Sequence, residues 1–142
     1  MRRFFPALFV LTLTAFGFMA GCSGSSTEPI EVPLVFEGEI AFQGRKFHNF
    51  TVVSTGTVRI ELVRLQEKVA DGAEPLGLNL SIGLGLGRPT ADQCPTRYSV
   101  QASEGELAVF ELSGAEFCVL LFDAGSLLPG QVVEYTVLVS SG

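Results

Sequence analysis

The sequence predicts an all-β fold: an antiparallel β-sandwich of about eight strands arranged like a jelly roll, with an immunoglobulin-like sandwich as the alternative. Apolar and polar residues alternate through most of the chain from Leu34 onward, which is the period of a half-buried strand. The 142 residues include 16 glycines and 7 prolines, which supply frequent turns. Short strands with frequent turns, and no convincing helix, favour two packed antiparallel sheets.

The composition favours one folded domain. Hydrophobic residues make up 47% of the chain and charged residues 17%, which argues against wholesale disorder. The formal net charge of −6 argues against a nucleic-acid partner, because phosphate backbones are bound by clustered Lys and Arg. We expect three parts: a leader over residues 1–21, a tether over 22–33 and a β-sandwich over 34–142.

Residues 1–21 have the anatomy of a secretion signal. The basic pair Arg2-Arg3 precedes the apolar stretch Phe4–Met19, and small residues follow that stretch. The stretch is too short to span a membrane comfortably, which takes about 20 apolar residues. The protein is therefore expected to be exported.

The segment Met19-Ala20-Gly21-Cys22 resembles the lipobox of bacterial lipoproteins. The resemblance implies cleavage before Cys22 and a diacylglyceryl group on its thiol, so that two or more acyl chains anchor the protein in a membrane. In that family an Asp after the cysteine marks retention in the inner membrane. Ser23 stands here, so the outer membrane is expected if the host has one, on either face. An ordinary signal peptide with a chance cysteine is the alternative. The Ser- and Gly-rich residues 22–33 form a flexible tether, which two prolines stiffen toward the domain.

Three strands are expected in the first half of the domain. The first begins at Leu34 and ends before a turn at Gly44. The second covers Phe47–Val53, and Ser54-Thr55-Gly56 has the composition of a hairpin turn. In the third strand, polar residues separate three apolar positions: Val58, Ile60 and Leu62.

The clearest strand is expected over Leu76–Leu86. Its apolar residues all fall on even numbers, so a strand places them on one face, whereas a helix would scatter them. Each glycine between them would also cost a helix about 1 kcal/mol relative to Ala. Before this strand, Val63–Ala73 offers the only helical material, and Asp71-Gly72 ends it.

Four further strands complete the expected set. Ser113-Gly114 marks a hairpin between two of them, and Tyr135 lies at a core position of the last. The four strands are Tyr98–Gln101, Leu107–Leu112, Ala115–Asp123 and Val132–Val139.

Two cysteines remain if Cys22 carries lipid. An even pair in an exported domain favours a disulfide, here between Cys94 and Cys118. The bridge would pin the Arg88–Arg97 loop onto the sheet, and the chain-entropy model gives about 3.5 kcal/mol for a loop of roughly 25 residues. A metal site is the alternative, but two thiolates need further ligands and His48 is the sole histidine. We expect no metal and no cofactor.

Four segments form a further pattern: Phe36-x-Gly38, Phe47–Val52 leading to Gly56–Leu62, Gly114–Asp123, and Tyr135–Val139. Together they resemble the bacterial pre-peptidase C-terminal domain. The resemblance implies a non-catalytic β-sandwich accessory domain of exported proteins. Arg45-Lys46 stands where that family has an acidic residue, and no acidic cluster matches the calcium sites of some members. Calcium binding is therefore not expected.

We expect no enzymatic activity. Nucleophilic catalysis needs a base beside the nucleophile, and His48 lies mid-strand, where an edge or surface role suits it better. Ser113 lacks the first glycine of a nucleophile elbow. Two carboxylate pairs are interpreted as solvated charges that keep strand edges from aggregating: Glu37 with Glu39, and Glu104 with Glu106.

Two features are candidates for ligand binding. Gly83, Gly85 and Gly87 leave one strand face nearly bare, which indicates close packing beneath a loop or the other sheet, or else a flat face for a ligand. Tyr98 is a candidate exposed aromatic in a chain without Trp. The expected function is protein interaction or an accessory role in the cell envelope, with an envelope protein or a polysaccharide as partner. A carbohydrate-binding module is the alternative.

Overall fold

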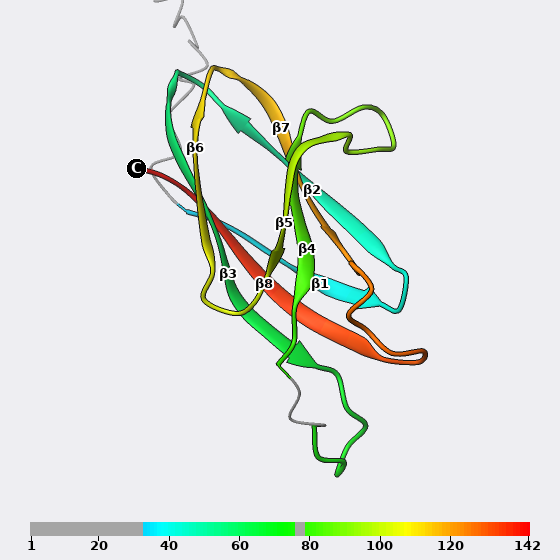
Figure 1. The fold of residues 1–142 in the computed structure, drawn as a ribbon. Coiled ribbons are helices and arrows are strands. Elements are labelled where there is room, and N and C mark those ends of the chain that lie inside the picture. Colours follow the sequence, from blue (N-terminus) through cyan, green and yellow to red (C-terminus); the bar gives the residue numbers. More distant parts are fainter. Residues whose placement is uncertain (1–32, 76–78) are drawn as a thin grey trace, which may run out of the picture.

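The computed structural model describes residues 33–75 and 79–142, which form eight strands (Figure 1). The strands are β1 (Leu34–Ala41), β2 (Arg45–Val52), β3 (Gly56–Glu67), β4 (Ile82–Gly87), β5 (Thr96–Ala102), β6 (Leu107–Leu112), β7 (Ala115–Phe122) and β8 (Val132–Ser141). The expected leader and nearly all of the expected tether lie outside the described residues. So do residues 76–78 of the expected fourth strand.

The strands form two four-stranded antiparallel sheets that pack face to face. Sheet A has the order β1-β8-β3-β6, and sheet B has the order β2-β7-β4-β5. Strand β1 pairs with β8, β2 with β7, β3 with β6 and β4 with β5, as in one long hairpin wrapped into a jelly roll. The predicted sandwich is therefore confirmed, and its strand order is the jelly-roll order.

Each side of the sandwich is formed by one edge strand from each sheet. On one side β1 meets β2, and the ring of Phe36 stacks on that of His48 with 4.7 Å between centroids. On the other side β5 meets β6, and Tyr98 contacts Phe110 edge-to-face at 5.0 Å. The first side also holds a part-buried hydrogen bond between His48 and Tyr135 of β8.

The core lies between the sheets and follows the predicted alternation. Val58, Ile60 and Leu62 of β3 are at most 2% exposed, and Tyr135 of β8 is 2% exposed, which confirms it as a core residue. A register shift between Leu62 and Arg64 then changes the phase, so that Leu65 faces inward. The first residues of the stretch with helical character, Val63–Glu67, continue strand β3.

Strand β4 begins at Ile82 rather than at Leu76. The predicted inward face is confirmed for Ile82, Leu84 and Leu86, which are all buried. Pairing with β5 starts at Ile82 opposite Ala102, because the chain turns away after Ala102 toward β6. Leu80, just before the strand, still packs against the core.

Candidate functional site

A groove of about 430 Å³ lies on the outer face of sheet B, the face turned away from sheet A. The connection between β4 and β5, residues 88–95, lies beside two outward-facing side chains of the sheet, Phe47 of β2 and Leu120 of β7. These two residues are directly paired across the β2–β7 ladder and are partly buried. The other lining residues are Arg45, Asp92, Gln93, Cys94, Pro95 and Thr96. We refer to this site as the loop groove.

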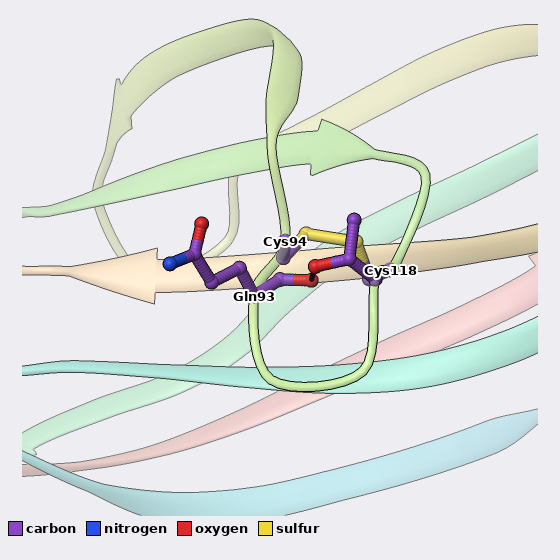
Figure 2. The surroundings of a disulfide bond; sticks show 4 residues. Gln93, Cys94 and Cys118 are labelled. Atoms are coloured by element: carbon purple, nitrogen blue, oxygen red, sulfur yellow. Dashed lines mark hydrogen bonds between the residues drawn. A yellow bond between two sulfur atoms is a disulfide. The ribbon is translucent and has the colours of Figure 1, made fainter.

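A disulfide fixes the loop wall of the groove. Cys94 in the loop is bonded to Cys118 of β7, as predicted, with 5.9 Å between their Cα atoms (Figure 2). Cys118 occupies an outward position of a central strand, opposite Asn49 on one side and Gly87 on the other. Within the loop, the Thr90 N–H donates to the Gln93 carbonyl at 2.8 Å. The loop is therefore held covalently to the sheet and internally by a turn.

The three glycines of β4 allow neighbouring side chains and the β4–β5 loop to lie close against the outer face of that strand. A Cβ on Gly83 would come within 2.3 Å of the Phe122 ring, and one on Gly85 within 2.5 Å of the Thr96 side chain. A Cβ on Gly87 would lie 2.0 Å from the Pro95 carbonyl oxygen. Close packing is therefore what the structure contains: Gly83 and Gly85 lie beneath side chains of β7 and β5, and Gly87 lies beneath the loop.

The rim of the groove is charged. Arg45 begins β2 and Asp92 lies in the loop, and both side chains are exposed. Gln93 and Thr96 add amide and hydroxyl groups to the same wall. An apolar floor between a cation, a carboxylate and neutral polar groups suits a ligand with both apolar and polar surface.

Tyr98 does not join this site. It lies on the inward side of sheet B, against Phe110 of β6, at the side of the sandwich formed by β5 and β6. The residues that do form the groove with the loop were not predicted as a site from the sequence: Arg45, Phe47 and Leu120. One signal was available, because alternation in β2 places Phe47 on the polar face, opposite to His48 and Phe50.

His48 lies between the sheets at the side formed by β1 and β2. Its Nε2 is 2.7 Å from the Tyr135 hydroxyl of β8, and its ring stacks on Phe36. Burial, reinforced by the positive charge of Lys46, lowers the pKa of His48, and burial raises the pKa of Tyr135 to about 12. The two residues thus share a hydrogen bond between groups whose neutral forms are favoured by burial. The predicted edge-strand position is confirmed, and the ring faces inward.

Two of the remaining candidate carboxylates make structural contacts. Glu39 forms an ion pair with Lys68. The Glu104 carboxylate accepts a hydrogen bond from the Leu65 N–H at 2.9 Å. Ser113 is exposed between β6 and β7. The structure does not bring these groups to the loop groove.

Asp123 organises the turn after β7. Its carboxylate accepts hydrogen bonds from the N–H groups of Gly125, Ser126 and Leu127, and from that of Gln43 in the β1–β2 turn. Desolvation acts to raise the pKa of Asp123, but the four backbone donors together hold it below its usual value. This carboxylate is thus a link between two turns.

Comparison with known proteins does not assign a family. No family profile matches the chain, and no curated protein sequence matches it. Within residues 33–75 and 79–142, no helix is long and apolar enough to cross a membrane. In the same residues, no group of three or more His, Cys, Asp or Glu side chains is placed to hold a metal ion.

Proposed function

We propose that this protein is a lipid-anchored, non-catalytic binding module of the bacterial cell envelope, and that it binds a protein ligand in the loop groove. One observation carries the proposal: a disulfide-fixed loop forms a groove of about 430 Å³ with an apolar floor and a charged rim. A rigid wall reduces the entropy lost on binding. Aromatic and aliphatic contacts surrounded by polar groups are typical of protein interfaces.

The membrane location rests on the lipobox-like segment ending at Cys22. The resemblance to the pre-peptidase C-terminal domain agrees with an accessory role, since it rests on strand patterns that span most of the sandwich. A Cys22→Ala variant is expected to lose acyl label and to leave the membrane fraction. Membrane retention of that variant would refute the anchor without bearing on the groove.

A carbohydrate ligand is the second candidate. Phe47 supplies an aromatic ring in the floor of the groove, and Arg45, Asp92 and Gln93 place hydrogen-bonding groups around it. An apolar ring beside planar polar groups is a composition that also suits a sugar face and its hydroxyls.

The deciding experiment uses the full lipidated chain in its own envelope. A photo-crosslinking amino acid at Gln93, on the groove wall, is expected to give a discrete protein adduct. The same group at Glu116, exposed on β7 but outside the groove lining, is expected to give none. Phe47→Ala should reduce the Gln93 adduct at least tenfold, because that ring is part of the floor.

A panel of envelope and environmental polysaccharides forms the second arm. Saturable polysaccharide binding lost in Phe47→Ala, without a protein adduct, would replace the first proposal with the carbohydrate module. Adducts of equal yield at both positions, or no ligand in either arm, would refute the loop groove as the binding site.

A further inference from the structure

Among residues 33–75 and 79–142, strand β6 is an edge strand with exposed apolar side chains. It ends sheet A, and it contains neither Lys, Arg nor Pro between Leu107 and Leu112. Natural edge strands are commonly protected by such residues, as β2 is by Arg45 and Lys46. The outward side chains Leu107 and Val109 are 52% and 54% exposed.

The free edge of β6 presents a definite set of backbone groups. The Leu62 N–H donates to the Glu106 carbonyl at 3.0 Å, so Glu106 directs its carbonyl toward β3. Direction alternates along an antiparallel strand. The N–H and C=O groups of Ala108 and Phe110 therefore point to β3, and those of Leu107, Val109 and Glu111 point away from it.

An apolar slot adjoins this edge between the two sheets. Its volume is about 280 Å³, and it is lined by Tyr98 and Val100 of β5, Leu84 of β4 and Ala108 of β6. Tyr98 and Val100 are 44% and 38% exposed. A strand placed beside β6 would direct every second side chain toward this slot.

The charges around β6 are mostly negative. Glu106 precedes the strand and lines the slot, Glu111 lies on its outer face, and Glu61 stands opposite Leu107. Arg59, opposite Val109, is a cation on this face of β3, and Arg64, further along the strand, lies 3.7 Å from Glu134 of β8. Because the chain also carries a net charge of −6, a second copy would bring like charges together.

We propose that the free edge of β6 binds an extended segment of a partner protein in which apolar residues alternate with Lys or Arg. The segment adds as a fifth strand to sheet A through the backbone groups of Leu107, Val109 and Glu111. Its apolar side chains enter the slot, and its basic side chains lie over the outer face, with their stems on Leu107 and Val109 and their charges near Glu61 and Glu111. This surface is distinct from the loop groove on sheet B.

The probe is a synthetic seven-residue peptide, capped at both ends, in which four lysines alternate with three valines. It is added to the full chain in a neutral detergent. We expect saturable binding at least tenfold tighter than that of a peptide of identical composition whose valines are consecutive. Equal affinity for the two peptides would show that only their charge matters, and it would overturn the proposal.

A matched pair of variants tests the edge. Val109→Pro removes an N–H that points away from β3, so it leaves the β3–β6 ladder intact, and it should lower affinity at least tenfold. Val109→Thr keeps that N–H and should bind within about threefold of the original chain. Unchanged peptide affinity of Val109→Pro would refute strand addition. Urea unfolding is the control for folding, and its midpoint should be unchanged in both variants.

Hydrogen exchange provides an independent readout. With the alternating peptide bound, the amides of Leu107, Val109 and Glu111 should gain protection, whereas Ala108 and Phe110 are protected already by β3. If these three amides instead become protected at high protein concentration without peptide, in a protein that is then dimeric, a second copy of the chain occupies the edge and the proposal is overturned. Arg45→Glu, in the loop groove, should leave peptide binding unchanged, so that failure here and failure of the proposed function are distinguishable.

Discussion

His48 and Tyr135 connect the two sheets at the side where β1 meets β2. The hydroxyl of Tyr135 and Nε2 of His48 form a part-buried hydrogen bond of 2.7 Å. Gly38 makes room for this contact, because a Cβ there would lie 2.4 Å from the Tyr135 oxygen. This polar pair thus links β2 of sheet B to β8 of sheet A, beside β1.

Stability should depend on pH through His48. Its folded-state pKa lies below the ordinary histidine value of 6.5, because burial and then the positive charge of Lys46 disfavour the charged form. The unfolded chain therefore binds a proton at a higher pH than the folded one. The contribution of neutral His48 to the free energy of unfolding is fully present above pH 6.5, and it is lost as the pH falls through the lowered pKa of the folded state. We expect the free energy of unfolding, measured with urea, to fall on acidification from about pH 7 to pH 5.

His48→Gln is the control for this pH dependence. Its side-chain amide can donate to or accept from the Tyr135 hydroxyl but does not titrate. The variant should show a flatter pH dependence over the same range. Parallel curves for the variant and the original chain would contradict the assignment to His48.

Tyr135→Phe should lower the free energy of unfolding by about 1 kcal/mol, since one part-buried hydrogen bond is lost while the ring stays packed. Urea unfolding at neutral pH measures this. Gly38→Ala should then cost less in the Tyr135→Phe background than in the original chain, because the clashing oxygen is gone. Equal costs in both backgrounds would show that the two residues are not coupled.

At the scale of single elements, β4 shows why glycines alternate with leucines. Leu84 and Leu86 face the core, while the glycines between them lie beneath Phe122, Thr96 and Pro95. The strand is therefore covered on both faces. Phe122 lies over Gly83 because these two residues are directly paired in the β4–β7 ladder.

Gly83→Ala should destabilise the protein by about 1 to 3 kcal/mol, because the new methyl group must displace the Phe122 ring. Gly56→Ala is the matched strand control, because its Cβ would meet nothing within 4 Å. That control should be neutral or slightly stabilising. Thermal unfolding of the two variants side by side measures the difference, and equal loss in both would refute the packing argument.

The sequence predicted strands far better than it predicted their lengths and surroundings. Alternation identified the inward residues of β3 and β4 correctly, because a buried face imposes period two on the chain. It could not place the start of β4 at Ile82, since that depends on where the partner strand β5 ends. Nor could it show the inward position of Leu65, which follows from a register shift against β8.

The loop groove could not be predicted from the sequence, because it also depends on the sheet topology. Arg45, Phe47 and Leu120 lie far apart in sequence from Asp92 and belong to strands joined only by the sheet topology. The disulfide could be predicted from the export signal and the cysteine count alone. The positions of Cys94 and Cys118 in the sequence do not show which face of which sheet the loop covers.

At the scale of the whole molecule, the disulfide is the main covalent constraint. Replacing both Cys94 and Cys118 by Ala should lower the free energy of unfolding by about 3.5 kcal/mol, because the unfolded chain gains the freedom of a loop of roughly 25 residues. Urea unfolding of the oxidised chain and of the double variant measures this. Two free thiols in the denatured, unreduced Cys22→Ala chain, by thiol titration, would instead show that the bridge does not form.

The jelly roll also brings the two ends of the sandwich together. Strand β1 starts with Leu34 opposite Val139, three residues before the end of the chain at Gly142. A short linker from Gly142 to Leu34 would turn the sandwich into a closed ring, which could be reopened in the exposed connection between β5 and β6. All eight strands would keep their neighbours, although synthesis would now begin with β6. The strand pairings of this architecture thus form a closed circle, and they do not depend on which strand comes first in the sequence.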